Sequence, residues 1–334
     1  MDLNNPQKVV IVQIGRIGDM ILTTPLFYEL KRLFPHWEIS VICTSENEKI
    51  IKYSSVISNI YIYPKNIIKR IQLIKKIKNE KFDIWIDTKP EFSNTSRLLL
   101  KYCHPKKSFG YNLIEKIFQV DLTRFKKENH YTDINLSIFK YFDSTYDPAL
   151  HRMPVIEIPV AMENNGINLP DRKFIIAINV SAGKESRIWQ KEKWLELIDR
   201  ISKISDCYFI LIGVSKHKFI LDYILSGYKN SNIIKIIDED ILKISDIIRK
   251  SNLLITPDTA LVHIASAFNI PQIVMYPNVR WNYERFAPLS NIHERIFSKD
   301  EKNISDIEVN EVLDRFKKIS GNAESRTRVQ TDDH

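Results

Sequence analysis

The chain has 334 residues, of which 44% are hydrophobic, 10% aromatic and 27% charged. This composition is typical of a globular protein with room for two domains, and it excludes the disordered and fibrous classes. The formal net charge is +8, and the excess lies almost wholly in residues 1–150, which hold 23 Lys and Arg against 16 Asp and Glu. The first half therefore suits an anionic partner, although lysine-rich solvated faces would give the same imbalance.

The first predicted unit runs from Lys8 to Pro35 and consists of a strand, a tight turn and a helix. Its strand is a β-branched apolar run, residues 9–14, which is typical of a strand covered on both faces. Residues 15–18 form a turn whose two glycines permit positive φ and close backbone approach, and Asp19 follows where the helix opens. Open α/β sheets bind ligands at this edge, so Asp19 is a candidate functional carboxylate. The alternative is an N-cap without further function.

The rest of the first half alternates strands and helices, which predicts a parallel, doubly wound sheet. Asp87 and the Thr88-Lys89-Pro90 segment that follows it end the fourth strand, again at a ligand-facing edge. The further strands are expected over residues 38–43, 59–63, 82–87 and 106–110, and the helices over 46–53, 67–78, 91–102 and 130–141.

The helix predicted over residues 67–78 is amphipathic, with isoleucines on one face and five Lys or Arg on the other. A basic amphipathic helix can lie on an anionic membrane. The alternative is a surface helix that covers the sheet.

A proline- and asparagine-rich segment, residues 147–172, interrupts the rhythm and reads as a linker. We therefore expect one α/β domain over residues 1–155 and a second over 173–304, followed by a helix over 305–320 that could pack back onto the first domain. A polar tail over 321–334 is expected to be disordered. In the second domain the strands are expected over residues 174–180, 208–213, 233–237, 253–256 and 272–276, and the helices over 189–204, 240–251 and about 258–268.

The second domain offers two turns suited to phosphate at the carboxyl ends of its strands. One is Ser181-Ala182-Gly183, whose backbone N–H groups lie near the cations Lys184 and Arg187. The other is Asp258-Thr259-Ala260, which opens a helix that carries His263 one turn later. Such groups could hold a diphosphate without a metal. The alternative interpretation is a helix cap at Asp258 and Thr259, with His263 a core histidine.

Other features limit the function classes. Cys43, Cys103 and Cys207 are isolated, which favours reduced core thiols over disulfides or zinc ligands. We expect no signal peptide at the N-terminus and no membrane span, because no apolar run approaches about 20 residues. The G-x-x-G spacing of residues 15–18 also differs from the dinucleotide fingerprint, so a nicotinamide enzyme has little support.

Four stretches, taken together and in order, resemble glycosyltransferase family 9, the heptosyltransferase family of lipopolysaccharide core assembly. The resemblance extends from Lys8 to about Pro288, and the combination is specific although each piece alone is not. The stretches are G-R-I-G-D-M-I-L-T-T-P over residues 15–25, N-V-S-A-G-K-E-S-R-I-W-Q-K-E-K-W over 179–194, T-P-D-T-A-L-V-H-I-A-S-A-F-N-I-P over 256–271 and Y-P-N-V-R-W-N-Y-E-R-F-A-P over 276–288.

This resemblance implies a GT-B fold, in which two Rossmann-like domains face each other across a cleft. It also implies metal-independent, inverting transfer from a nucleotide sugar, typically ADP-heptose. By this resemblance Asp19 matches the general base, Arg187 a phosphate-binding cation, and Asp258, Thr259 and His263 the D-T-G-x-x-H donor motif. The basic first half would meet a phosphorylated glycolipid acceptor, with Arg16, Lys89 and Arg97 as candidates.

Two departures from the family pattern lie in the donor motifs. The usual D-T-G reads D-T-A, with Ala260 in place of glycine, and the usual N-P-G-A reads N-V-S-A. Both leave the donor sugar open, so a different nucleotide sugar is the first alternative and a catalytically silent glycan-binding relative the second. The expected location is the cytoplasm, with peripheral contact to the inner membrane, and nucleic acid is not an expected partner.

Overall fold

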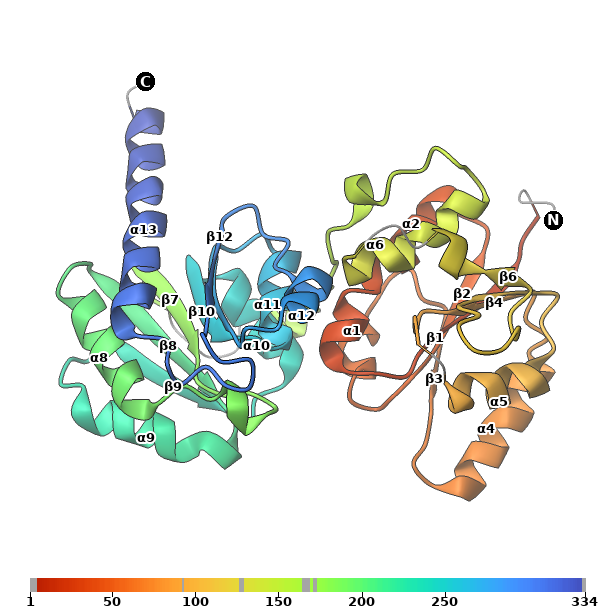
Figure 1. Cartoon of the computed structure of the whole chain (residues 1–334), viewed down its shortest axis with the longest axis horizontal. Coiled ribbons are helices and arrows are strands. Elements are labelled where there is room, and N and C mark those ends of the chain that lie inside the picture. The colour runs from red at the N-terminus through yellow and green to blue at the C-terminus, as the bar shows by residue number, and fades with distance from the viewer. Residues whose placement is uncertain (1–4, 92, 126–128, 164–168, 171–172, 332–334) are drawn as a thin grey trace. The chain divides into compact units, whose positions relative to one another are not determined.

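The computed structural model describes residues 5–91, 93–125, 129–163, 169–170 and 173–331, with side chains placed through Gly321. It divides into two compact units (Figure 1). The first comprises residues 1–157 with Glu284–Phe286, and the second comprises the remainder. The division after Glu157 falls inside the segment that the sequence marks as a linker, of which 164–168 and 171–172 lie outside the described residues.

The first unit is built on a six-stranded parallel sheet with the order β3-β2-β1-β4-β5-β6. Its central strand β1 pairs with β2 on one side and β4 on the other, and all of its residues after Lys8 are buried. Apolar side chains that cover a strand on both faces make this burial possible. The strands are β1 (Lys8–Gln13), β2 (Glu38–Cys43), β3 (Asn59–Ile62), β4 (Ile84–Asp87), β5 (Lys107–Gly110) and β6 (Val120–Asp121).

Helices cover this sheet, with α4 and α5 side by side (Figure 1). The predicted first helix is divided, because Pro25 stands at the start of a second helix and cannot donate to the turn before it. The helices are α1 (Ile17–Ile21), α2 (Thr24–Leu33), α3 (Glu48–Ile51), α4 (Ile67–Asn79), α5 (Asn94–Cys103) and α6 (Tyr131–Leu136), and the 3₁₀ turns are η1 (Leu122–Phe125), η2 (Ser137–Tyr141) and η3 (Pro148–His151).

The second unit repeats the design with the order β12-β11-β10-β7-β8-β9. Counted from its own first strand, this is the 3-2-1-4-5-6 order of the first sheet read from the other edge. Both sheets therefore have a topological switch point beside their first strand, at β1/β4 and at β7/β10. The strands are β7 (Phe174–Asn179), β8 (Cys207–Gly213), β9 (Ile233–Ile237), β10 (Leu253–Pro257), β11 (Gln272–Tyr276) and β12 (His293–Phe297).

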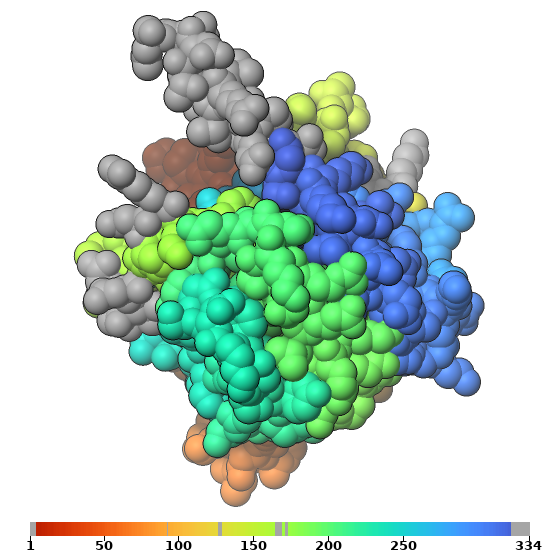
Figure 2. Space-filling view, turned by 90° about the vertical axis from the view of Figure 1, so that its left-hand side faces the viewer, coloured from red at the N-terminus to blue at the C-terminus, as the bar shows by residue number. Residues whose placement is uncertain are grey.

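Helices α8 and α9 lie side by side on the face of the second unit that Figure 2 shows in green and turquoise. Among the described helices, none combines the length and apolarity needed to cross a bilayer. The helices are α7 (Val160–Glu163), α8 (Lys191–Ser202), α9 (Lys218–Gly227), α10 (Ile241–Arg249), α11 (Ala260–Ala267), α12 (Arg280–Phe286) and α13 (Val309–Thr331), and the 3₁₀ turns are η4 (Glu185–Arg187) and η5 (Ser215–His217).

The C-terminal helix corrects two expectations. Instead of packing back onto the first unit, α13 buries Val312, Leu313 and Phe316 in the core of the second unit. The structure describes α13 as continuing to Thr331, into the segment where a disordered tail was expected, and residues 332–334 lie outside the described residues. The helix starts at Val309, four residues later than the expected start.

The elements that were not predicted from the sequence include β6, β12, α9 and α12. β6 has only two residues, and the apolar residues of β12 and α12 are too few to show a period. In contrast, α9 is a mostly apolar helix of ten residues that was overlooked. The three cysteines are free and buried, as expected, and burial raises the pKa of each thiol to about 12.

Candidate active site

Asp19 lies at the switch point of the first sheet, in the first turn of α1. It is the third helical residue, and Arg16 is the N-cap, so the N-cap interpretation of Asp19 is wrong in detail. Its carboxylate still helps to cap the helix, because Oδ2 accepts a hydrogen bond from the backbone N–H of Arg16 at 3.2 Å. Burial raises the pKa of the Asp19 carboxyl above its usual value, and the Arg16 hydrogen bond opposes this rise. A carboxylate with a raised pKa is a stronger base.

Gly15 leaves room for this carboxylate. A Cβ atom at position 15 would lie 2.9 Å from Oδ2 of Asp19 and 3.0 Å from Oε1 of Gln13. Of the two properties that a glycine permits in this turn, Gly15 uses close approach and not positive φ, because its φ is outside that region. Any side chain at residue 15 would therefore displace the carboxylate or the amide.

A buried polar network holds the backbone behind Asp19. The Gln13 amide donates to the Thr23 hydroxyl at 2.8 Å and to the Tyr131 hydroxyl at 3.0 Å. The Thr23 hydroxyl in turn donates to the Asp19 carbonyl at 2.7 Å, and Asn135 donates to Thr23 at 3.2 Å. No local sequence pattern predicts this network, and its one signal in the sequence is a glutamine at the end of an otherwise apolar strand.

Asp87 ends β4, next to β1, and is 2% exposed. Its carboxylate accepts from the backbone N–H of Lys89 at 2.9 Å and from the Ser96 hydroxyl. Burial nevertheless raises the pKa of Asp87 to about 6. A second carboxyl with a perturbed pKa thus lies at the same sheet edge as Asp19.

The three cations proposed for the acceptor are less alike than the sequence suggested. Arg16 and Lys89 are exposed and follow the adjacent strands β1 and β4. Arg97, on α5, forms an ion pair with Glu115 at 3.1 Å in which both side chains are about half exposed. Arg16 and Lys89 therefore flank the switch point, whereas the charge of Arg97 is balanced by Glu115.

In the second unit, Arg187 and Asp258 meet at the other switch point. Nη1 of Arg187 lies 2.9 Å from Oδ2 of Asp258 and also donates to the Asp258 carbonyl at 2.9 Å. Asn282 donates to the same Oδ2 at 2.9 Å. A guanidinium has five N–H donors in a planar fork, so it can bind an oxyanion while it holds this carboxylate.

Thr259 is the N-cap of α11, and its hydroxyl accepts from the Leu261 N–H at 3.3 Å. Asn179, at the end of β7, donates to the hydroxyls of Thr259 at 3.2 Å and Thr256 at 2.9 Å. The cap interpretation therefore holds for Thr259 and not for Asp258. Asn179 was missed as a site residue, and it joins the β7 turn to the start of α11.

The remaining donor candidates differ in access. The Ser181 N–H donates to the Asn179 side chain at 3.1 Å and is thus engaged within the protein, contrary to expectation. Gly183 and Lys184 are exposed, Ala182 is partly buried, and His263 is 5% exposed on α11.

Ala260 is the first residue of α11, so its helical backbone needs no glycine and the D-T-A sequence fits without strain.

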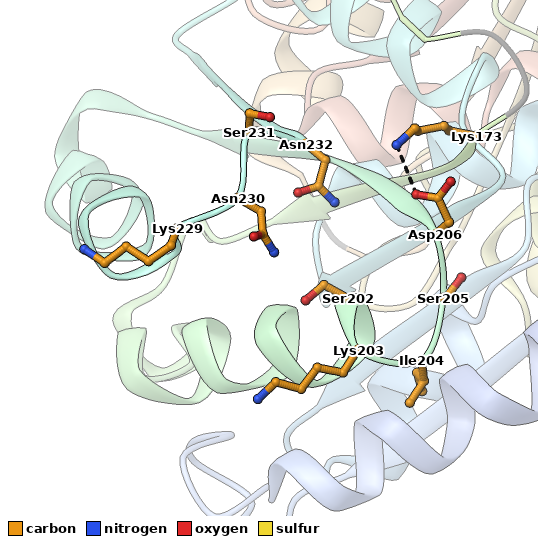
Figure 3. Close-up of a pocket in the computed structure, with 10 residues that line it drawn as sticks. All are labelled: Lys173, Ser202, Lys203, Ile204, Ser205, Asp206, Lys229, Asn230, Ser231 and Asn232. Atoms are coloured by element: carbon orange, nitrogen blue, oxygen red, sulfur yellow. Dashed lines mark hydrogen bonds and ion pairs between the residues drawn. The ribbon is translucent and has the colours of Figure 1, made fainter.

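A cavity of about 750 Å³ lies away from these residues (Figure 3). Its lining residues precede strands: Lys173 stands before β7, Asp206 before β8 and Asn232 before β9. It is thus at the amino edge of the second sheet, where Lys173 and Asp206 pair at 3.0 Å. Because doubly wound sheets bind ligands at the carboxyl edge, we do not assign this cavity to the donor.

Comparisons with known proteins bear on both units. The model of the family described as glycosyltransferase family 9 (heptosyltransferase) matches residues 70–316. Lipopolysaccharide heptosyltransferase 1 of Campylobacter coli is 23% identical over 286 residues, 80% of this chain and 83% of that protein. A family 9 glycosyltransferase of Veillonella parvula superposes with a TM-score of 0.81 at 17% identity, covering 96% of this chain and 98% of that one.

A third likeness is to the ADP-heptose lipopolysaccharide heptosyltransferase II of E. coli, with a TM-score of 0.75 at 16% identity over 95% of this chain and 99% of that one. These superpositions confirm the predicted fold, an α/β protein of the GT-B class with two doubly wound parallel sheets.

Proposed function

Because the chain belongs to glycosyltransferase family 9, whose members move sugars, we propose that it transfers heptose from ADP-heptose to a lipopolysaccharide core acceptor with inversion at the anomeric carbon. One observation carries the proposal. A partly buried carboxylate with a raised pKa, that of Asp19, occupies one switch point, and a guanidinium beside a helix N-terminus occupies the other. An inverting transfer needs a base for the acceptor and cationic or N–H groups for the leaving diphosphate.

In the proposed reaction, Asp19 takes the proton from an acceptor hydroxyl as its oxygen attacks the anomeric carbon. The bond between that carbon and the diphosphate oxygen breaks on the opposite face. Arg187, Lys184 and the first N–H groups of α11 would then stabilise the negative charge on the departing ADP. The proposal assigns this charge stabilisation to protein groups and not to a metal ion.

The acceptor side is proposed from charge. Arg16 and Lys89 flank the Asp19 switch point and are exposed, so they suit a phosphorylated sugar or lipid. The Campylobacter coli and E. coli relatives are named as lipopolysaccharide heptosyltransferases, and this agrees with an anionic glycolipid acceptor.

A panel of nucleotide sugars tests the donor. ADP-heptose at about a hundredfold excess over its Kd should stabilise the protein by roughly 2.7 kcal/mol, whereas a sugar that does not bind should leave Tm unchanged. ADP release with acceptor then tests turnover. A shift with a UDP- or GDP-sugar and none with ADP-heptose would contradict the heptose assignment. Equal background release by the wild type and Asp19→Ala from every donor would support the silent relative.

A further inference from the structure

Helix α4 carries exposed isoleucines that do not pack against the core of the first unit. Leu73 and Ile77 face the core of the first unit, with exposures of 8% and 0%. Ile67 and Ile68 are each 64% exposed and Ile71 is 50% exposed, all within the first five residues of the helix. Leaving three aliphatic side chains in water is unfavourable, so this end of the helix requires an explanation other than stability.

The same segment carries only positive charge. Residues 64–79 contain no Asp or Glu, and their six basic residues are Lys65, Lys69, Arg70, Lys75, Lys76 and Lys78. The carboxylates on adjoining segments offset little of this charge. Glu46 lies 3.8 Å from Lys65, with both side chains largely exposed, and Glu80 lies 3.9 Å from Lys8.

The topology places these residues at the functional edge of the first unit. β3 ends at Ile62, which is itself 45% exposed, and α4 begins at Ile67. Because all strands of this sheet are parallel, the start of α4 lies at the edge where Asp19 follows β1 and Lys89 follows β4. Figure 1 shows α4 in orange beside α5.

We propose that this α4 patch, consisting of Ile62, Ile67, Ile68 and Ile71 with the six basic residues of the segment, docks on an anionic lipid bilayer. The isoleucines enter the boundary between headgroups and acyl chains, while the lysines bind the headgroups and lay their methylene stems on the surface. A protein partner fits less well, because lysine is depleted in protein interfaces. Docking brings the Asp19 edge toward a lipid-borne acceptor, but binding itself requires no turnover.

Sedimentation with vesicles tests the docking. Wild type should bind phosphatidylcholine vesicles that contain phosphatidylglycerol, bind vesicles of phosphatidylcholine alone far more weakly, and be released by high salt. Lys69→Gln/Lys75→Gln/Lys78→Gln should bind about 100-fold more weakly, at roughly fivefold for each lysine. Ile67→Ser/Ile68→Ser/Ile71→Ser should lose binding at least tenfold and retain the wild-type Tm, because these side chains are exposed.

Two matched controls use residues outside the patch. Leu150→Ser/Val160→Ser/Ile204→Ser removes three side chains that are 76%, 80% and 53% exposed. Lys203→Gln/Lys218→Gln/Lys317→Gln removes three lysines that are 69%, 58% and 56% exposed. Both should bind vesicles within twofold of wild type, since neither changes the patch.

Four outcomes overturn the proposal: no binding of the wild type to anionic vesicles, patch variants that bind like the wild type, controls that lose as much binding, or self-association in solution that the isoleucine variant abolishes. The last would make a second copy of the chain the occupant. Transfer to a soluble acceptor fragment without vesicles is measured in parallel. Vesicle binding without transfer counts against the proposed function alone, and transfer without vesicle binding counts against the docking alone.

Discussion

The two units share one strand order and differ in what they place at the switch point. In the first unit the groups there are carboxylates, Asp19 and Asp87, and burial raises the pKa of both. In the second unit they are Arg187 and the N-terminus of α11, with Asn179 holding Thr259. In the proposed reaction the same scaffold would supply a base at one sheet and an oxyanion site at the other, through a few residues after β1, β4, β7 and β10.

The surrounding interactions differ in the same way. The residues behind Asp19 form an uncharged network of Gln13, Thr23 and Tyr131, which fixes a backbone without lowering the basicity of the carboxylate. In the second unit the guanidinium is fixed by a charged partner, Asp258. The uncharged network adds no charge of its own near Asp19, and burial raises the pKa of this carboxyl although Arg16 and Arg285 act to lower it. In the proposed reaction the cation Arg187 must remain in place for an anionic ligand, and it benefits from a carboxylate neighbour.

Replacing Asp19, the proposed base of the first unit, should have the largest effect on activity. Asp19→Asn keeps an oxygen for the Arg16 N–H and removes the proton acceptor, so kcat should fall by about 10²–10⁴-fold. In the wild type, kcat/KM should decline as pH falls through the raised pKa of Asp19, because the carboxylate becomes protonated. Donor binding by titration calorimetry is the control and should be unchanged. Asp19→Asn activity within tenfold of wild type would remove Asp19 from the role of base.

Removing the guanidinium should affect the other switch point selectively. Arg187→Ala loses charge-assisted hydrogen bonds to the diphosphate, so the Kd for ADP should rise roughly 30- to 100-fold. Arg187→Lys should recover part of this loss. Arg200→Ala is the matched control, since Arg200 lies on α8 and pairs with Glu196 at 3.1 Å. Equal losses in the two alanine variants would show that the Arg187 effect is nonspecific.

Enlarging residue 15 tests the room around the carboxylate. In Gly15→Ala the new methyl would displace Oδ2 of Asp19, and kcat should fall roughly 10- to 100-fold while the Kd for the donor stays constant. Gly321→Ala serves as the control, because a Cβ there meets nothing within 4 Å. If donor affinity fell and kcat did not, Gly15 would not be the residue that leaves room for the Asp19 carboxylate.

The smallest expected effect concerns stability. The pKa of Asp87 is raised in the folded state, so folding favours its protonated form and stability falls as pH rises from about 3.8 to about 6. Asp87→Asn removes this penalty, which is up to about 3 kcal/mol above pH 6. Its Tm should exceed that of wild type by a few degrees at pH 8 and by much less at pH 4. A difference in Tm that is independent of pH would count against burial of an ionised Asp87.

Much of this arrangement could be predicted from sequence where the pattern is local. Buried strands such as 9–14 and 174–180 are apolar runs followed by turns. The two sheets therefore follow from periodicity, as do the carboxyl edge of the first, which bears Asp19, and that of the second, which bears Asp258. The strand order at the switch points does not, because pairing depends on contacts between distant segments. The Gln13–Tyr131 bond is an example, since it joins residues 118 positions apart.

Side-chain partners were the least predictable part of the site. Arg187 was expected to bind phosphate, but nothing local indicated that its guanidinium would lie against Asp258, 71 residues away. The Ser181 N–H was expected to face a ligand, but it donates to the side-chain oxygen of Asn179 instead. Both outcomes depend on geometry that only the packed sheet and helix determine.

The position of Asp19 inside α1 has a consequence for the catalytic cycle. In the proposed reaction the carboxylate that accepts the Arg16 N–H also accepts the proton of the acceptor. A protonated carboxyl is a weaker hydrogen-bond acceptor, so each transfer would loosen the first turn of α1 until the proton is released to solvent. The first turn of α1 would thus become less ordered at each proton transfer and regain its order when the proton is released, once per turnover.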